Sequence, residues 1–288
     1  MVLSGIQENA ERQRMTDKFT TFAKKLAAVR HELAKQGLDG MLLTRTDRFQ
    51  GEEVRKQDEY LAWLTGFTGS AGVALILADT AVVATDSRYM VQIKQQVDPA
   101  LYQTIDTADQ SLAEWLAACP GKAEVKIGFD SWSVTCDGKN KLPTVLGEAD
   151  VVWQSVSAHP VVAVWSDRQT SSETDIFIVD EGYAGLSAKQ KIKQAADELK
   201  ESQLDLRFIS APDVMMWLTN LRGHDLCFTP VHLCFGILSA RGQLTFVTNN
   251  SQITEQGYAC IGWTELEKYL VSLKRQLLLM IDSCLCCI

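Results

Sequence analysis

The stretch Trp63-Leu64-Thr65-Gly66-Phe67-Thr68-Gly69 has a near copy, Trp217-Leu218-Thr219-Asn220-Leu221-Arg222-Gly223, 154 residues further along the chain. After each copy come two short apolar runs separated by a turn, which is the pattern of a β-hairpin. The runs are 73–77 and 82–85 after the first copy, and 233–238 and 244–248 after the second. A pattern that returns at a fixed offset indicates an internal repeat.

The elements around this stretch also occur twice and in the same order. A helix is expected over Thr16–Gln36, with Gly37 as its C-terminal glycine, and a short apolar strand follows it. A second helix is expected from Ser187, which forms a capping box with Gln190, and a short apolar strand follows it too. Farther on, a helix at 112–118 and a strand at 127–131 correspond to 266–273 and 279–283. The sequence therefore predicts two tandem α/β units, each a mixed sheet flanked by helices.

The second unit is expected to be incomplete. Five residues follow Asp282-Ser283, whereas the first unit continues, after Asp130-Ser131, through a helix expected around Gly138–Leu146 and a strand at Val151–Val156. The polar run Gln169–Thr174 is typical of a linker. The expected boundaries are a polar tail at 1–16, a first domain at 17–160, a linker at 161–185 and a shortened second domain at 186–288.

Composition excludes several classes of partner. The net charge of −8 argues against binding to nucleic acid or to anionic membranes, because both need a surplus of Lys and Arg. No window holds about 18 apolar residues, which a membrane-spanning helix would need. The opening residues contain no apolar run of the signal-peptide type. We therefore expect a cytoplasmic protein with neither a nucleic-acid nor a membrane partner.

Cysteine and histidine placement gives little support to a metal site. Cys284 and Cys287 form a C-x-x-C, and Cys227, His232 and Cys234 lie near one another in the chain. A structural zinc site normally pairs two such motifs at regular spacing, and the sequence has only one. A zinc site and unliganded thiols are both possible interpretations, and unliganded thiols are favoured. None of the four histidines is expected to act as a base or as a metal ligand.

The three glycines Gly66, Gly69 and Gly72 are spaced G-x-x-G-x-x-G. A dinucleotide-binding loop needs G-x-G-x-x-G between a strand and a helix, so that the helix N-terminus faces the pyrophosphate. Here the spacing differs and a strand follows the glycines. We therefore expect a tight turn rather than a phosphate-binding loop.

The segment Thr85-Asp86-Ser87-Arg88-Tyr89 is expected to end a strand and begin a helix, with Asp86 as the helix cap. A cation in the first turn of a helix lies at the unfavourable end of the helix dipole, so Arg88 needs an explanation. One interpretation is a surface ion pair with a nearby carboxylate. The other is that Arg88 clamps the carboxylate of a ligand or of a neighbouring subunit.

Five segments together resemble aminopeptidase P (Xaa-Pro aminopeptidase), specifically its two creatinase-type N-terminal domains. The first three, in the first domain, include a quite specific Gly-Phe-Thr-Gly-Ser-Ala-Gly run. The fourth resembles the family's interdomain connector, and the last resembles the signature of its second N-terminal domain. The five segments are 47–52, 63–72, 85–89, 164–168 and 217–225. Ser87 and Gln169 depart from the usual family residues, which are Gly and Pro, and His224 is also unusual.

The resemblance implies a three-domain metallopeptidase that removes an N-terminal residue preceding proline. Two divalent metal ions, usually manganese, would lie in a C-terminal catalytic domain on an Asp-Asp-His-Glu-Glu set that this sequence does not contain. We therefore expect a non-catalytic N-terminal half, inactive alone, with no metal or catalytic residue of its own. Its expected partners are a further copy of the chain, the catalytic domain and, when joined to that domain, a peptide; Arg88 is the candidate for the substrate mouth or a subunit contact. The alternative is a stand-alone protein-binding or scaffold module of the same domain type.

Overall fold

The computed structural model describes residues 20–119, 124–142, 145–146, 149–169, 174–273 and 279–281. The chain divides into two compact units. Unit 1 comprises Met1–Arg45 and Lys56–Gln169, and unit 2 comprises Thr46–Arg55 and Thr170–Ile288. No helix in the described ranges is long and apolar enough to cross a membrane.

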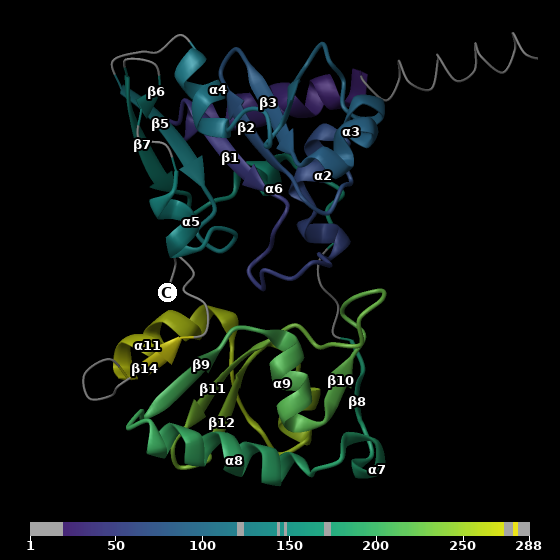
Figure 1. The fold of residues 1–288 in the computed structure, drawn as a ribbon, viewed down its shortest axis with the longest axis vertical. Coiled ribbons are helices and arrows are strands. Elements are labelled where there is room, and N and C mark those ends of the chain that lie inside the picture. Colours follow the sequence, from purple (N-terminus) through teal and green to yellow (C-terminus); the bar gives the residue numbers. More distant parts are fainter. Residues whose placement is uncertain are drawn as a thin grey trace, which may run out of the picture. The chain divides into compact units, whose positions relative to one another are not determined.

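Unit 1 is built on a seven-stranded mixed sheet in the order β4-β3-β2-β1-β5-β7-β6 (Figure 1). The strands are β1 (Gly40–Thr44), β2 (Val73–Leu77), β3 (Ala81–Thr85), β4 (Gln103–Asp106), β5 (Glu124–Phe129), β6 (Val145–Leu146) and β7 (Ala149–Ser155). The central strand β1 pairs antiparallel with β2 and parallel with β5. Strand β1 is thus paired on both edges. Its first four residues are buried, as expected for a central strand.

Helices pack against this sheet. Residues 20–35 form the first helix, whose apolar stripe of Leu26, Val29 and Leu33 is buried. Gly37 follows it with φ of 69°, which confirms the expected C-terminal glycine. The other helices of unit 1 are η1 (Lys56–Asp58), α2 (Tyr60–Thr65), η2 (Ser87–Tyr89), α3 (Met90–Gln96), α4 (Leu112–Ala118), α5 (Cys136–Asn140) and α6 (Pro160–Val164).

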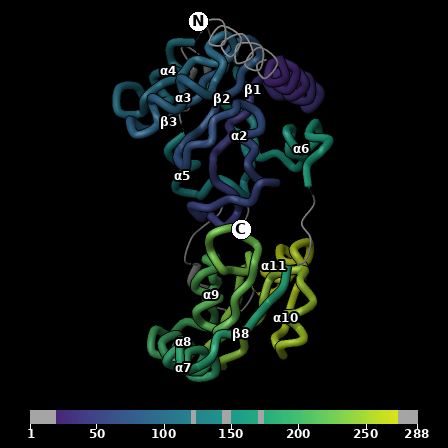
Figure 2. Tube along the Cα trace, turned by 90° about the vertical axis from the view of Figure 1, so that its right-hand side faces the viewer, coloured from purple at the N-terminus to yellow at the C-terminus, as the bar shows by residue number. Residues whose placement is uncertain are grey.

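Unit 2 contains a five-stranded sheet in the order β13-β12-β11-β9-β14 and a separate two-stranded sheet, β10-β8. The strands are β8 (Ile176–Ile178), β9 (Leu206–Ile209), β10 (Leu221–Gly223), β11 (Phe235–Ser239), β12 (Leu244–Val247), β13 (Ala259–Ile261) and β14 (Leu279–Ile281). The helices are α7 (Glu181–Ala184), α8 (Ala188–Glu201), α9 (Pro212–Thr219), α10 (Gln252–Glu255), η3 (Trp263–Glu265) and α11 (Leu266–Leu273). Helices α8 and α9 lie on one side of the unit, and α10 and α11 on the other (Figure 2).

The strand topology confirms the predicted repeat. The order β13-β12-β11-β9-β14 corresponds to β4-β3-β2-β1-β5, and each matched pair of neighbours runs in the same relative direction, antiparallel at the hairpin and parallel at both flanks. The predicted capping box is present too, because the Ser187 hydroxyl accepts from the Gln190 backbone N–H at 3.2 Å. Within the described ranges, unit 2 has no counterparts of β7 and β6.

The structure differs from the sequence expectations in two places. The helix expected around Gly138–Leu146 is present but shorter and earlier: α5 spans Cys136–Asn140, and the short strand β6 occupies Val145–Leu146. A helix cannot readily continue there, because Pro143 disfavours helical backbone in the residue before it. The expected linker at 161–185 holds most of α6 and all of β8 and α7, and β8 pairs antiparallel with β10. The polar run at 169–174 therefore covers only the middle of the expected linker, and helices and a strand lie on either side of it.

The most unexpected feature is the path of the chain after β1. Residues Thr46–Arg55, which lie within the first repeat in sequence, belong to unit 2. The chain leaves unit 1 at Arg45 and re-enters it at Lys56. Unit 2 is therefore assembled from two separate pieces of the chain.

Candidate functional site: a polar cavity in unit 2

Unit 2 contains a cavity of about 380 Å³, which is within the usual range of small-molecule sites. Its wall combines residues from the inserted segment Thr46–Arg55 with residues from the strand ends and loops of the second repeat. The lining residues are Arg48, Phe49, Arg55, Thr174, Asp225, His232, Leu233, Thr248, Asn249, Asn250 and Trp263. Polar and charged side chains predominate, so the cavity is suited to a polar ligand.

Phe49 fixes the inserted segment in the core of unit 2. Its ring meets Phe235 edge-on at 5.3 Å between centroids, and Trp263 at 5.8 Å. Phe235 in turn contacts Phe208 at 5.3 Å and Trp263 at 5.2 Å, also edge-on. Edge-to-face contacts of this kind contribute about 0.5–1.5 kcal/mol each beyond the burial of the rings.

Glu53 fixes the far end of the same segment. Its carboxylate accepts hydrogen bonds from the backbone N–H groups of Cys227 at 2.8 Å and Phe228 at 3.1 Å, and from the hydroxyl of Thr229 at 3.0 Å. The inserted segment is therefore held at both ends. Both Arg48 and Arg55 line the cavity; Arg48 directly precedes Phe49 in the chain, and Arg55 follows Glu53 by two residues.

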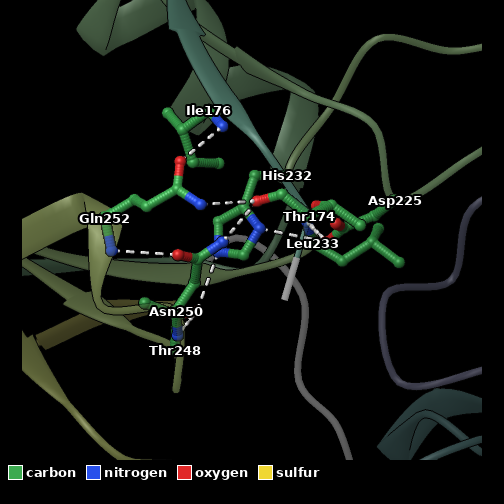
Figure 3. Close-up of polar contacts among 8 residues, drawn as sticks. All are labelled: Thr174, Ile176, Asp225, His232, Leu233, Thr248, Asn250 and Gln252. Atoms are coloured by element: carbon green, nitrogen blue, oxygen red, sulfur yellow. Dashed lines mark hydrogen bonds and ion pairs between the residues drawn. The ribbon is translucent and has the colours of Figure 1, made fainter. Parts of the chain in front are cut away.

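A chain of hydrogen bonds, Asp225–His232–Thr248, joins three of the residues that line the cavity (Figure 3), and we call these three residues the cavity floor. Asp225 Oδ2 lies 3.0 Å from His232 Nδ1, and His232 Nε2 lies 2.8 Å from Thr248 Oγ1. Because the carboxylate requires a donor, Nδ1 carries a proton, and in the neutral ring Nε2 accepts from the threonine hydroxyl. His232 and Thr248 are both buried, with 5% and 4% of their surface exposed.

The Asp225 carboxylate accepts two further hydrogen bonds, one from the backbone N–H of Leu233 at 2.7 Å and one from the hydroxyl of Thr174. Burial alone would raise the pKa of this carboxyl. The hydrogen bonds from His232 and Thr174 outweigh that effect and hold the pKa below its usual value. Asp225 is thus an ionised, fully engaged acceptor that orients the histidine.

A second set of contacts ties β8 and the residues just before it to the turn that follows Thr248 (Figure 3). Asn250 Nδ2 donates to the carbonyl oxygen of Thr174 at 2.9 Å, and its Oδ1 accepts from the backbone N–H of Gln252 at 3.0 Å. Gln252 Oε1 accepts from the backbone N–H of Ile176 at 3.0 Å. The start of β8 is therefore fixed to the β12–α10 turn through side-chain amides.

The order acid, imidazole and hydroxyl is that of a nucleophilic triad. Here, however, the Thr248 hydroxyl also accepts from the backbone N–H of Asn250 at 3.1 Å, and it is buried in the turn. A nucleophile must reach a substrate carbonyl beside donors that stabilise an oxyanion. We assign the Asp225–His232–Thr248 chain the role of supporting the cavity floor.

Comparison with known proteins identifies both repeats. Residues 25–163 and residues 167–276 each match a model of the creatinase/prolidase N-terminal domain. Over 284 residues the chain is 28% identical to a probable Xaa-Pro aminopeptidase P of Coprinopsis cinerea. The chain belongs to the aminopeptidase P family. The matched regions are the family's two N-terminal domains.

The alignments with relatives cover most of this chain but less than half of each relative. The alignment with the Coprinopsis protein covers 91% of this chain and 43% of that protein. Xaa-Pro aminopeptidase 1 of Dictyostelium discoideum is 25% identical over 244 residues, with 81% and 39% covered. The chain thus spans less than half the length of these relatives.

Among solved structures, the X-prolyl aminopeptidase of Caenorhabditis elegans has the same fold. The TM-score is 0.78 at 22% sequence identity, over 88% of this chain and 45% of that chain. The Caenorhabditis protein is described as a cytosolic enzyme with a di-nuclear active site. The likeness supports the α/β architecture with two tandem N-terminal domains that the sequence predicts.

Arg88 lies in unit 1 and is not among the residues that line the cavity. As predicted, Asp86 caps η2, with its Oδ1 accepting from the backbone N–H of Arg88 at 3.0 Å. The Arg88 guanidinium also binds the same carboxylate in bidentate fashion, Nε to Oδ1 at 2.9 Å and Nη2 to Oδ2 at 2.8 Å. These bonds hold the pKa of Asp86 below its usual value. The Arg88 side chain is nevertheless 71% exposed, so its outer face is accessible.

The three glycines lie in the irregular segment between α2 and β2. Gly66 ends α2 with φ of 81°. A Cβ atom at either Gly69 or Gly72 would collide with the ring of Phe67, which is fully buried. These two glycines therefore let the chain wrap closely around that ring.

The cysteines and histidines of the described ranges form no metal-binding group. Within the described part of the chain, no group of three His, Cys, Asp or Glu side chains is placed to hold a metal ion. Cys234 is buried, which raises the pKa of its thiol well above the usual value, while Cys227 is exposed. The expected pair Cys284 and Cys287 lies outside the described residues.

Sequence reasoning missed the cavity and dismissed His232. The lining residues that come from the second repeat are spread from Thr174 to Trp263 and form no known sequence motif. The two arginines come from the other repeat altogether. Asp225 and Arg48 each belong to a segment that resembles the family, 217–225 and 47–52. Neither segment indicates that the two residues line the same cavity.

Proposed function

We propose that this chain acts as the non-catalytic N-terminal half of an Xaa-Pro aminopeptidase-like metallopeptidase, whose parent reaction removes an N-terminal residue preceding proline. The observation that carries the proposal is the pair of creatinase/prolidase N-terminal domain matches, at 25–163 and 167–276. The fold that it shares with 45% of the length of the Caenorhabditis enzyme, at TM-score 0.78, supports it.

The described residues do not fit the family's metal pair. Two-metal hydrolysis needs a set of carboxylate and imidazole ligands that hold both ions about 3.5–4 Å apart. No three such side chains converge in the part of the chain that the structure describes. No step of the parent reaction is therefore assigned to a residue of this chain.

The proposed role is to supply contacts between subunits and to shape the mouth of the active site when a catalytic domain is present. Arg88 is the proposed mouth or subunit residue, because its guanidinium is fixed by Asp86 while most of its surface is exposed. The proposed partners are a second copy of the chain, the family's catalytic domain and its peptide. The proposed location is cytoplasmic, as described for the Caenorhabditis enzyme.

The test is an activity assay of the purified chain on a peptide with proline in the second position, with and without added Mn²⁺. We expect no release of the N-terminal residue in either condition. The Caenorhabditis enzyme, assayed in parallel, is the positive control. Metal-dependent release by this chain, retained through successive purification steps, would contradict the proposal.

A further inference from the structure

Trp63 and Trp217 occupy equivalent positions in the two repeats, 154 residues apart. Each lies in a short helix, α2 or α9, that ends at a residue with left-handed backbone, Gly66 with φ of 81° or Asn220 with φ of 57°. The threonine before that residue donates from its hydroxyl to the carbonyl oxygen four residues earlier, at 2.7 Å in both helices. The two rings thus have the same backbone setting, so what covers one ring indicates what fits on the other.

In unit 1 the tryptophan is covered by the connector, residues 164–168. Trp165 stacks on Trp63 with 5.1 Å between ring centroids and 23° between ring planes. Two residues further along, the Asp167 carboxylate attracts the ammonium group of Lys25, which lies 4.4 Å from the centroid of the Trp63 ring. Burial lowers the pKa of Lys25, and Asp167 partly offsets that shift. The connector therefore brings an aromatic ring and a carboxylate to this helix.

In unit 2 the equivalent ring is open. Trp217 is 53% exposed, and no aromatic ring of the described residues packs on it. It keeps the lysine contact, with the Lys191 ammonium group 4.6 Å from its centroid. The backbone N–H of Val179 donates to the carbonyl oxygen of Asn220 at 2.8 Å, which places Ile178, 63% exposed, beside the end of α9. A large open ring near a second exposed apolar side chain is typical of an interaction surface.

Two cations near Trp217 have no carboxylate partner among the described residues. Lys191 and Arg222 donate their hydrogen bonds to carbonyl and amide oxygens, which are all neutral. Burial lowers the pKa of Lys191, and the Arg222 guanidinium lowers it further. In unit 1 the equivalent lysine faces Asp167 instead. A carboxylate at the same place in unit 2 would stabilise both cations.

From this comparison we infer that the exposed face of Trp217 is a docking site for a protein segment of connector chemistry, one that presents an aromatic ring two residues before a carboxylate. The ring stacks on Trp217 as Trp165 stacks on Trp63, and the carboxylate faces Lys191 and Arg222. The occupant is a segment other than the connector itself, which is already held in unit 1. Stacked aromatic rings and charge pairs shielded from water are the contacts that dominate protein interfaces.

The experiment measures binding of a peptide to the whole chain by calorimetry. The peptide has the sequence of residues 159–169, which includes the ring and the carboxylate of the connector. Trp217→Ala removes the ring from the docking site, and Phe228→Ala removes another exposed ring of unit 2 and serves as the matched control. Peptides with Trp165→Ala or Asp167→Asn test the two groups separately. Sedimentation velocity of the chain and of Trp217→Ala shows whether a second copy occupies the site instead.

We expect the peptide to bind, and Trp217→Ala in the chain to weaken binding by about tenfold or more, as for an interface hot spot. Phe228→Ala should leave it unchanged. In the peptide, Trp165→Ala should have an effect of similar size, and Asp167→Asn should weaken binding by about threefold, as for a partly exposed charge pair. If Trp217→Ala lowers the melting temperature, fluorine NMR of the chain labelled with 5-fluorotryptophan decides: the Trp217 signal, assigned with Trp217→Phe, should shift on addition of the peptide.

Three results would overturn the inference. The first is no binding at millimolar peptide. The second is equal weakening in Trp217→Ala and Phe228→Ala. The third is a dimer of the chain that Trp217→Ala dissociates, which would assign this surface to a second copy. None of these measurements depends on peptidase activity, so the inference and the proposed function fail separately.

Discussion

Lys191 donates a hydrogen bond to the carbonyl oxygen of Trp217 at 3.0 Å and lies 4.6 Å from the centroid of that tryptophan ring. Lys25 makes the same two contacts with Trp63, at 3.0 Å and 4.4 Å. Each lysine extends from the long helix of its repeat to the end of the next helix, where the last carbonyl groups lack intrahelical partners. The repeat is therefore preserved in individual contacts as well as in strand order.

Lys191→Met should destabilise unit 2. The ammonium group is buried and also donates to Asn220 Oδ1 at 2.8 Å, so its removal leaves buried acceptors without a donor. We expect the free energy of unfolding to fall by about 1–3 kcal/mol, measured by urea unfolding. Lys193→Met, on the exposed face of the same helix, is the control and should cost less than about 1 kcal/mol. An equal loss of unfolding free energy in the two variants would show that the buried contacts of Lys191 do not stabilise unit 2.

Phe49→Ala should destabilise unit 2, although its neighbours before Thr46 and after Arg55 in the sequence belong to unit 1. The ring fills a buried site against Phe235 and Trp263, and truncation of such a ring costs about 3–5 kcal/mol. Hydrogen exchange should show faster exchange of amides in β9 and β11 while β1 stays protected. Phe129→Ala, in β5 of unit 1, should give the opposite pattern. Loss of protection in β1 alone for Phe49→Ala would show that the segment stabilises unit 1.

The fold could be predicted from the sequence largely because it is repeated. Periodicity, caps and turns located the hairpins, the helix α8 and its capping box, and the constant offset joined them into two units. The helix expected around Gly138–Leu146 is present only as α5, which ends at Asn140, because Pro143 disfavours helical backbone in the residue before it. The strand β8 was missed because its three residues acquire strand structure only by pairing with β10, some 40 residues away.

The cavity could not be predicted for a different reason. Sequence patterns report on local structure, and nothing local to Arg48 or Arg55 indicates that residues 46–55 pack in the other unit. The aromatic cluster that holds the segment joins Phe49 to Phe235 and Trp263, which lie about 190 and 210 residues away. His232 was set aside because no ligand or base spacing surrounds it, and its partners Asp225 and Thr248 come together only through the fold.

Arg88→Ala should leave folding nearly unchanged. The ion pair with Asp86 is exposed, and pairs of this kind contribute about 0–1 kcal/mol. In a protein that joins this chain to a catalytic domain of the family, the same substitution should lower kcat/KM for X-Pro peptides. Asp86→Ala is the matched control for loss of the helix cap, which costs about 1 kcal/mol. An unaltered kcat/KM with an unaltered melting temperature would leave Arg88 as a surface partner of Asp86 only.

The stability of unit 1 should depend on pH through His159. Its ring packs on Tyr60 at 4.2 Å between centroids, and its buried Nδ1 has no hydrogen-bond partner among the described residues. Burial, with the nearby Arg168 guanidinium as a second cause, lowers the pKa of His159 to about 4. Tyr60, whose pKa burial raises to about 12, stays neutral throughout this range.

The direction of the effect follows from proton binding. Between the usual histidine pKa of about 6.5 and the folded pKa of about 4, the unfolded chain takes up a proton that the folded chain does not, so stability falls as pH falls through this window. The loss from this group approaches about 3 kcal/mol at the acid end and is absent above pH 6.5. His159→Phe retains the ring contact but cannot titrate, so its urea-unfolding free energy should decline less between pH 7 and pH 4.5 than that of the parent chain. His31→Gln, on the exposed face of the first helix, is the control for a change of one histidine. Parallel declines for His159→Phe and the parent chain would show that His159 is protonated in the folded state and that acid destabilisation arises elsewhere.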